Sequence, residues 1–512
     1  MLHRERVLRI NISREPNTLD PRRVFDPSHY TVASLLFEGL TKLEPDLRVR
    51  LAQAESIEIS PDQLVYTFHL GSSKWSNAEP VTAFDFEKTF LDLLDPQFPA
   101  PHAHLLYDIK NAQECKSGFL PLSEAGICAI DAATLRITLK HPNPSFLQIL
   151  ANSALVPVYR KIADKDSSWA NSAGPTFVCN GPFILDSWDR QVQLVLKTNP
   201  YYSHKTRPKI KEIQIAMIDN EMSALHMYAN GYLDIIGTPL SQIPLSYLKD
   251  LKEKKLLTIQ PVAASLFCSF NTTVYPFTNA NLRKAFATAI NRRDIIQHIT
   301  LVDDEPALGA IPSILKQKKS KTWIEDANTV QAQQYFNKAL EELALTKEQF
   351  GEVTLYYWPF ELNYRISQTL QQQWLQSLGV KVRIEMVDFK TLLAKVADGN
   401  YELALFAWNA EYADPLSLLQ RFRLPNDTKN YCRWHSEKFN AFLDLAALET
   451  ESDKRLDLLE KAEDVLMEEM PMAPIFHWSF PLLIQPRVQG FSIDALGAIH
   501  LENISLANEE YP

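Results

Sequence analysis

The segment WNAEYADP, from Trp408 to Pro415, places an aromatic ring and two carboxylates within a few residues. It follows the apolar run YELALFA, which has the length and composition of a buried strand. Open α/β sheets place their ligand sites just beyond the carboxyl ends of strands, so we expect this segment to border a ligand site. Asp414, which precedes Pro415, is expected to cap the helix PLSLLQRF that follows.

No enzyme signature accompanies this segment. The sequence contains no P-loop, no glycine-rich dinucleotide motif after a strand, no GxSxG elbow and no HExxH zinc motif. His102 and His104 form an HAH pair, but zinc needs a third protein ligand, so we expect a surface loop there. We therefore expect a binding protein with no cofactor and no metal, and not an enzyme. A hydrolase whose triad is dispersed along the sequence is the rival from another class.

Length and composition indicate a globular protein of several domains. The chain has 512 residues, of which 46% are apolar and 22% charged, and one core rarely holds so many. Its net charge of −10 argues against a phosphate-binding surface, so nucleic acid is not an expected partner. The one basic cluster, at 315–321, is expected to be a solvated loop.

Membrane insertion is not expected, because no run of 18 apolar residues is present. The opening residues MLHRERVLRINIS lack the apolar stretch of a signal peptide. On this evidence the protein is either cytosolic or exported with its signal already removed.

Five cysteines are too few for a disulfide scaffold, and they show no metal-ligand spacing. Cys115 and Cys128 are close enough in sequence to bridge a short loop, and both the bridged and the free form stay open. Cys179, Cys268 and Cys432 are expected to be buried thiols.

The first part of the chain mixes strands and helices. Thr82, with Asp85 three residues later, is expected to begin a helix with an apolar stripe of Phe84, Phe86, Phe90, Leu91 and Leu94. The other expected elements are a strand at 6–13, a helix at 31–40, a hairpin at 55–70, a strand at 131–142, a helix at 145–154 and a hairpin at 183–200.

The second part alternates helices and strands, which predicts parallel crossover units and an α/β domain. Long amphipathic helices are expected at 280–299 and 328–345. They are followed by a strand at 352–358, a helix at 364–379, a strand at 380–387, a helix at 389–399 and a strand at 401–408.

Several segments, taken in order, resemble one known family. They are NTLDP near the start, LLFEGL at 35–40, WSNAEPVTAFDF at 75–86, NGPFILDSW at 180–188 with NPYY at 199–202, YANGYLDI at 228–235, the stretch at 270–296, and WNAEYADP. On these motifs the chain resembles the extracytoplasmic solute-binding proteins of ABC transporters, specifically the dipeptide, oligopeptide and nickel receptor group. The resemblance covers essentially the whole chain.

The resemblance implies an α/β fold of the type II periplasmic binding protein kind, with two lobes, a hinge and an additional inserted domain. The first lobe would comprise residues 1–37, 165–262 and 479–512, the inserted domain 38–164, and the second lobe 263–478. It also implies a periplasmic or otherwise extracytoplasmic location, with a lipid anchor to the membrane as one form of it.

The function implied is that of a monomeric receptor in an ABC peptide importer, which captures short oligopeptides between its lobes and delivers them to the membrane permease subunits. The alternative is the same fold binding a non-peptide or modified ligand, such as a muropeptide, a metal chelate or a haem.

The resemblance also implies roles for individual residues. Oligopeptide receptors anchor the peptide's α-amino group on the acid three positions after the strand-end tryptophan, which is Glu411 here, with Trp408 excluding water. Asn409, Ala410 and Tyr107 complete the ligand-contacting residues expected in these parts of the chain.

Two expected departures from the family pattern concern the rest of the peptide. The segment that would pair with it as a strand falls on Phe25, Asp26 and Pro27, and a proline offers no N–H to a ladder. Val396 and Leu405 occupy positions at which oligopeptide receptors carry basic residues for the peptide carboxylate, so Arg365 or His298 is considered as a substitute. Asn409 replaces a cysteine of enteric-type receptors, whose partner position is Ala264.

Overall fold

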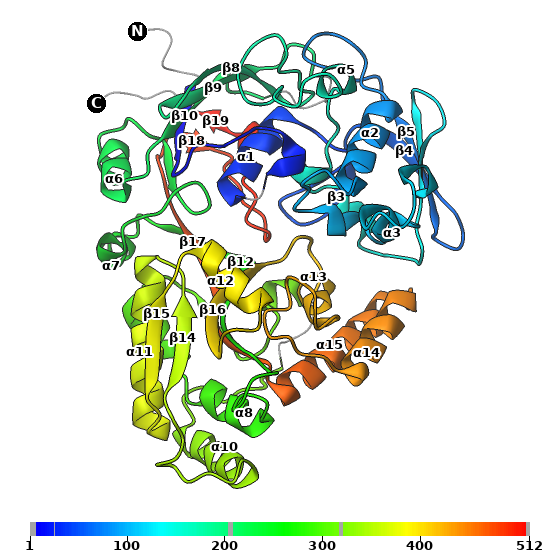
Figure 1. The fold of residues 1–512 in the computed structure, drawn as a ribbon. Coiled ribbons are helices and arrows are strands. Elements are labelled where there is room, and N and C mark those ends of the chain that lie inside the picture. Colours follow the sequence, from blue (N-terminus) through cyan, green and yellow to red (C-terminus); the bar gives the residue numbers. More distant parts are fainter. Residues whose placement is uncertain (1–6, 25, 203–207, 317–320, 508–512) are drawn as a thin grey trace. The chain divides into compact units, whose positions relative to one another are not determined.

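The computed structural model describes residues 7–24, 26–202, 208–316 and 321–507 (Figure 1). The chain forms two compact units. Unit 1 comprises Met1–Pro244, Lys255–Thr258 and Phe480–Pro512, and unit 2 comprises Leu245–Lys254 and Ile259–Ser479. Two long strands, β12 (Thr258–Phe270) and β17 (Met472–Ile484), carry the chain from one unit into the other.

The main sheet of unit 1 has the strand order β8-β9-β10-β1-β11, with the last residues of β17 beside β11. β1 is parallel to β10 and β11, and the remaining pairs are antiparallel. Leu8, Ile10 and Ile12 of β1 are buried, as the predicted strand at 6–13 requires. The strands span β1 Val7–Ile12, β8 Phe183–Asp189, β9 Gln193–Thr198, β10 Glu212–Met217 and β11 Ile235–Gly237.

A second, antiparallel sheet of unit 1 has the order β4-β5-β7-β6. The predicted hairpins at 55–70 and 183–200 are both confirmed. The predicted capping box is also present, because the Thr82 N–H donates to Asp85 at 2.9 Å at the start of α2. The strands of this sheet and of two small hairpins span β2 Thr41–Leu43, β3 Val49–Leu51, β4 Ala54–Ile59, β5 Val65–Leu70, β6 Ile127–Ala129, β7 Thr134–Thr138, β18 Val488–Gln489 and β19 Ser505–Leu506.

The helices of unit 1 are mostly short. The helix predicted at 31–40 instead begins at Pro27 and ends at Leu36. The helix predicted at 145–154 is reduced to Phe146–Ile149. The helices span α1 Pro27–Leu36, α2 Ala83–Leu94, α3 Ala112–Lys116, α4 Phe146–Ile149, α5 Arg160–Ala163, α6 Glu221–Ala229 and the single turns η2 Pro21–Arg23, η3 Ala103–Leu106, η4 Leu122–Glu124, η5 Ser153–Leu155 and η9 Leu501–Asn503.

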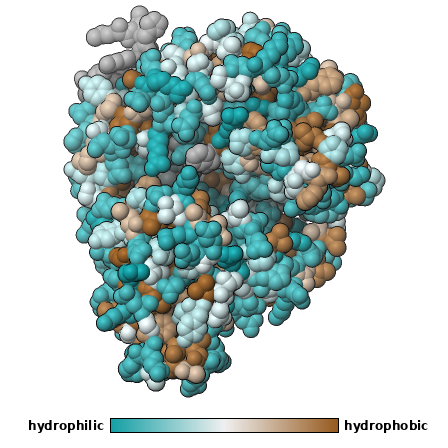
Figure 2. Space-filling view, in the orientation of Figure 1, coloured by the Kyte–Doolittle hydropathy of each residue, from teal (hydrophilic) through white to brown (hydrophobic). Residues whose placement is uncertain are grey.

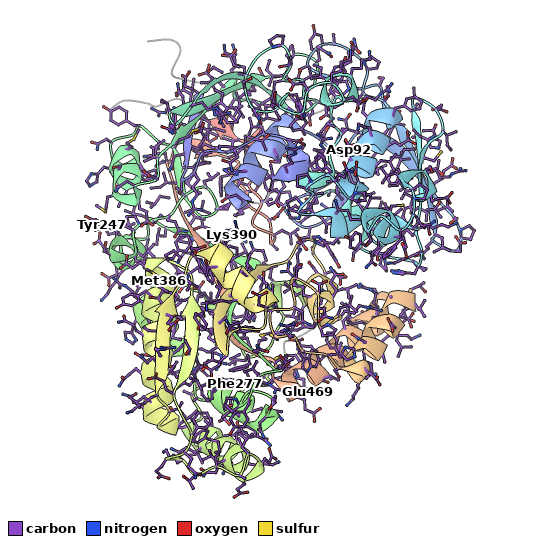
Figure 3. All side chains as sticks on the ribbon, viewed as in Figure 1. Asp92, Tyr247, Phe277, Met386, Lys390 and Glu469 are labelled. Carbon is purple, nitrogen blue, oxygen red and sulfur yellow. The ribbon has the colours of Figure 1, made fainter. Side chains whose placement is uncertain are left out.

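Unit 2 contains a mixed sheet of order β15-β14-β16-β12-β17, with the short β13 on β17. β14 is parallel to β15 and β16, which confirms the predicted crossover units, whereas β12 runs antiparallel to β16. Met386, at the end of β15, and Lys390 mark the edge at which these parallel strands finish (Figure 3). The strands span β13 Glu305–Pro306, β14 Val353–Tyr357, β15 Val382–Met386 and β16 Leu403–Asn409.

The helix predicted at 280–299 is wrong as a single element. It divides into α8 and α9, because the Asn291 side chain accepts the N–H of Asp294 and begins a new helix. The helices of unit 2 span α7 Leu245–Glu253, α8 Ala280–Thr288, α9 Arg292–Ile295, η6 Ile296–Thr300, η7 Ser313–Leu315, α10 Thr329–Glu342, α11 Glu361–Leu378, α12 Phe389–Ala397, α13 Leu416–Leu419, η8 Gln420–Phe422, α14 Glu437–Leu448 and α15 Ser452–Glu469.

An aromatic cluster forms part of the core of unit 2. Phe277 stacks on Phe270 with ring centroids 5.4 Å apart and lies edge-on to Phe286 at 5.3 Å. Trp374 of α11 packs on Phe286 and donates its indole N–H to the Phe286 carbonyl at 2.9 Å. Figure 3 labels Phe277 at the opposite end of the sheet from Met386. This packing fixes α8 and α11 on the sheet that carries WNAEYADP at its other end.

The surface is mainly hydrophilic, with hydrophobic residues in small groups on the face shown in Figure 2. No helix in the described ranges is long and apolar enough to span a membrane. The basic cluster at 315–321 lies mostly outside the described residues. The division of the chain into two lobes and an inserted domain at 38–164 stays a prediction.

Candidate functional site

WNAEYADP begins where β16 ends, as predicted. Trp408 lies opposite Ser265 of β12, and Asn409 lies opposite Ala264, so the positions expected to face each other do so. The Ala410 N–H donates to the Ala263 carbonyl at 2.8 Å and extends the pairing by one bond. The backbone that presents Glu411 is therefore fixed by the sheet.

Trp408 is 3% exposed and packs within a group of aromatic rings. Its ring centroid lies 4.1 Å from that of Phe267, 4.9 Å from that of Phe422 and 6.2 Å from that of Tyr431. Among the described residues, no acceptor lies within hydrogen-bond reach of its buried indole N–H.

Glu411 lies in a turn that its own backbone and Ser417 hold together. The Glu411 N–H donates to the Ser417 hydroxyl at 2.8 Å. Its carboxylate is mostly buried, with 14% of the side chain exposed, and it contacts two cations. The Lys429 ammonium donates to both oxygens, at 3.1 Å and 3.2 Å, and the Arg421 guanidinium lies 3.7 Å from the second oxygen. The predicted amine anchor therefore holds an ammonium supplied by the protein itself.

Arg421 is the more firmly held of these two cations. Its side chain is 9% exposed and donates to the Asn409 carbonyl at 2.7 Å and to the Ser417 carbonyl at 3.4 Å. Its guanidinium also lies over the Trp408 ring, 5.6 Å from the ring centre. Arg421 thus joins the end of β16 to α13 and keeps a fixed positive charge beside Glu411.

Lys429 comes from the loop between η8 and α14. Burial lowers the pKa of its ammonium, and although Glu411 opposes this, repulsion from Arg421 adds to it. No sequence pattern predicted either cation, since they lie in separate turns and follow no periodic spacing. A search for basic residues within about 20 positions after WNAEYADP could have nominated them.

Asp414 has the capping role expected of it and a further role that was not foreseen. Its Oδ1 accepts the Leu416 N–H at 2.8 Å at the start of α13. The same carboxylate forms a buried ion pair with Arg455 of α15, at 2.6 Å and 3.2 Å. The two acids of WNAEYADP therefore differ in their surroundings. Asp414 forms a buried ion pair with a neighbouring helix, whereas the Glu411 carboxylate faces Lys429 and Arg421 in the turn after β16.

The segment expected to pair with a peptide strand is not extended throughout. Phe25 lies outside the described residues, and Pro27 is the first residue of α1. The Asp26 carbonyl accepts the N–H groups of His29 and Tyr30, at 3.0 Å and 3.2 Å, as a residue at the start of a helix does. Tyr107 follows η3 in unit 1 and is half-buried.

The positions considered for holding a peptide carboxylate carry two apolar residues and two basic residues that already have acidic partners. Val396 and Leu405 are buried apolar residues of unit 2. Arg365 pairs with Glu361 one turn earlier on α11, and His298 pairs with Asp294 at 2.9 Å. Both side chains are exposed and each is paired with an acid four positions earlier in the chain, so their role toward a ligand stays a prediction.

His102 and His104 do not lie on a fully exposed loop, because both are partly buried around η3, and the His102 ring contacts Tyr30 edge-on at 5.6 Å. Cys115 and Cys128 are free thiols and do not form a bridge. Cys115 is buried and donates to the Pro121 carbonyl at 3.2 Å, whereas Cys128 is exposed on β6. The expected burial of the other three cysteines is confirmed.

A cavity of about 590 Å³ lies elsewhere in unit 2, around the start of α9. Its polar lining includes Asn291, Asp294, Gln297, Thr322, Glu325 and Asp326. Asp326 accepts the N–H groups of Arg292 and Arg293, so part of this lining serves to cap α9. The cavity is large, but Glu411 with its fixed geometry is the better candidate site.

Comparison with known proteins places the chain in a family. Residues 48–430 match the model for bacterial extracellular solute-binding proteins, family 5. The oligopeptide-binding protein OppA of Bacillus subtilis is 32% identical over 500 residues, which cover 97% of this chain and 92% of that protein. The dipeptide-binding protein DppE of the same organism is 29% identical over 97% of this chain and 91% of its own.

Solved structures agree over the full length. The crystal structure of Haemophilus influenzae OppA in complex with RPPGFSPFR has a TM-score of 0.84, with 25% identity, and covers 99% of this chain and 100% of its own. An oligopeptide-binding protein of Borrelia burgdorferi has a TM-score of 0.85 at 28% identity, covering 98% and 100%. The α/β fold of the type II periplasmic binding protein kind is thereby confirmed. The chain belongs to the bacterial extracellular solute-binding proteins of family 5.

Proposed function

We propose that this protein is the substrate-binding receptor of an ABC importer, and that it captures short peptides and delivers them to a membrane permease. Two relatives that match nearly the whole chain are named as oligopeptide- and dipeptide-binding proteins. The structure of the relative from Haemophilus influenzae contains the peptide RPPGFSPFR. These likenesses favour a peptide over a muropeptide, a metal chelate or a haem.

The observation in this chain that carries the proposal is the Glu411 carboxylate, at the end of β16. It is rigidly presented and mostly buried, and it receives the Lys429 ammonium at 3.1 Å and 3.2 Å. A peptide's α-ammonium has the same charge and three N–H donors. We therefore assign Glu411 as the group that binds the α-amino end of the ligand.

Trp408 contributes a second recognition element in this proposal. Its indole N–H is buried and has no acceptor among the described residues. A peptide carbonyl would satisfy this donor, and the surrounding rings exclude water from the nearby charges. Asn409 and Ala410 continue the backbone edge, and we assign Asp26, Pro27 and Tyr107 to ligand contacts on unit 1.

The proposal extends to the setting of the protein. We assign it an extracytoplasmic location, with attachment to the membrane surface through a lipid as the specific form to be tested. It acts as a monomer on the permease, without a cofactor and without catalytic turnover.

A peptide library tests this function. A ligand present at about 100 times its Kd stabilises the folded protein by about 2.7 kcal/mol, which a thermal unfolding assay detects. We expect a subset of di- to nonapeptides to raise the melting temperature, and mass spectrometry of material released on denaturation to identify peptides. The proposal fails if no peptide shifts unfolding while a haem, a metal chelate or a muropeptide does.

A further inference from the structure

The turn that carries Lys429 is well defined by hydrogen bonds from its neighbours. The buried Asn430 side chain donates to the carbonyls of Leu424 and Trp434, at 2.9 Å and 2.8 Å. The Lys429 N–H donates to Asp427 at 2.8 Å. The backbone at Lys429 is therefore held in place, and its side chain extends from a fixed point to the Glu411 carboxylate.

The two cations beside Glu411 differ in how easily they can leave. Arg421 donates to two carbonyls as well as facing Glu411, so moving it would leave several acceptors without donors. The Lys429 side chain is 29% exposed, against 9% for Arg421. A lysine has a flexible four-carbon stem, so Lys429 can turn its ammonium toward water without any backbone change.

The charges at this turn limit what can bind there. Lys429 and Arg421 contribute two positive charges beside the Glu411 carboxylate, and the Asp427 carboxylate, which accepts the Lys429 N–H, adds a second negative charge in the same turn. A ligand ammonium placed on the same carboxylate would be a third cation in a mostly buried site, where like charges repel strongly. The ammonium of the ligand and that of Lys429 therefore cannot share Glu411 at low cost.

We propose that Lys429 is a specificity-determining residue, which competes with a ligand's α-ammonium for Glu411 and leaves the carboxylate when such a ligand binds. This inference rests on the proposed function, because it assumes a peptide bound with its amino end at Glu411. The lowered pKa of Lys429 is consistent with the exchange, since burial already disfavours its charged form at this place.

The exchange has a consequence for the class of ligand. When a ligand's free ammonium displaces Lys429, it adds binding free energy equal only to the difference between its own interaction with Glu411 and that of Lys429. A peptide whose amino end is acylated leaves the Lys429–Glu411 pair intact, so it does not strand a buried carboxylate. The site should therefore discriminate weakly between free and N-acylated peptides, and accept both.

Replacing Lys429 tests this directly. The probes are a pool of random tetrapeptides and the same pool after N-acetylation, and the readout is the ratio of their apparent Kd values, measured by tryptophan fluorescence. In Lys429→Met we expect the preference for the free amine to increase about tenfold or more over wild type, because the competitor is gone and acetylated peptides now leave Glu411 without Lys429. Lys429→Gln should behave in the same way if the methionine variant folds poorly.

Two controls separate this effect from a general change in charge. Lys438→Met removes an exposed lysine of α14 and should leave the ratio at the wild-type value. Lys429→Arg keeps a cation that can reach Glu411, and should also stay close to wild type. An unchanged ratio in both Lys429→Met and Lys429→Gln, with peptides still bound, overturns the inference alone. Failure of the acetylated pool alone to bind wild type also overturns the inference alone, whereas failure of both pools overturns the proposed function as well.

Discussion

Asp414→Asn should destabilise unit 2 severely, although it changes only one atom of the side chain. Asp414 and Arg455 form a buried pair with distances of 2.6 Å and 3.2 Å, and their side chains are 11% and 6% exposed. Asparagine can still accept the Leu416 N–H, so the helix cap survives while the counter-charge is lost. An uncompensated buried guanidinium costs about 3 to 5 kcal/mol.

Urea unfolding followed by circular dichroism measures this loss as a shift of the transition midpoint. Glu411→Gln is the matched control in the same segment, and it should cost clearly less than Asp414→Asn, because the Lys429 it leaves behind can reach water and Arg421 keeps its two carbonyl acceptors. Asp414→Asn combined with Arg455→Met should recover much of the loss, since no buried charge then remains. If Asp414→Asn lowers the free energy of unfolding by less than about 1 kcal/mol, the claim that Asp414 stabilises the fold while Glu411 serves ligand binding is refuted.

Two further predictions concern unit 1. Gly237 has a φ of +118°, and a Cβ at this position would lie 2.3 Å from the Pro481 carbonyl oxygen. Gly237→Ala should therefore destabilise the protein by about 3 kcal/mol in urea unfolding. The control is Gly351→Ala, where a Cβ would have nothing within 4 Å and the change in stability should stay within about 0.5 kcal/mol. Burial opposes the charge on His500, but bonds to Asp494 and Glu502 outweigh it and raise its pKa to about 9, so its stabilising effect is complete below pH 6.5 and is lost as the pH rises through 9. The loss should reach about 3 kcal/mol by pH 10 in wild type and be absent in His500→Gln; equal pH profiles for the two proteins would contradict the assigned partners.

Local sequence signals predicted the elements that position the site. The apolar run before Trp408 predicted β16, the alternation with helices predicted its parallel neighbours, and the proline after Asp414 predicted the cap of α13. The break between α8 and α9 was missed although its signal was present, because Asn291 with Asp294 three residues later is a typical helix start.

The features that no sequence pattern predicted are contacts between turns. Lys429 and Arg421 reach Glu411 from separate segments, and Arg455 reaches Asp414 from another helix. Their positions depend on how loops cross at the end of the sheet, which periodicity does not encode. For the same reason the sequence left open whether Cys115 and Cys128 form a disulfide. They are close in sequence, but one thiol is buried and the other is exposed, and the two are not bridged.

The binding of one peptide with a free and with an N-acetylated amino end, to wild type and to Glu411→Gln, tests the central claim most directly. If Glu411 holds the α-ammonium, the two changes remove the same interaction and their effects are not additive. Because Lys429 offsets part of the ammonium's gain, the predicted coupling is below about 1.4 kcal/mol in wild type, and it rises to about 1.4 kcal/mol or more, a tenfold difference in Kd, when the same cycle is measured in the Lys429→Met background. Additive effects on Kd, with both proteins folded and binding the peptide, would show that the ligand amine does not meet Glu411.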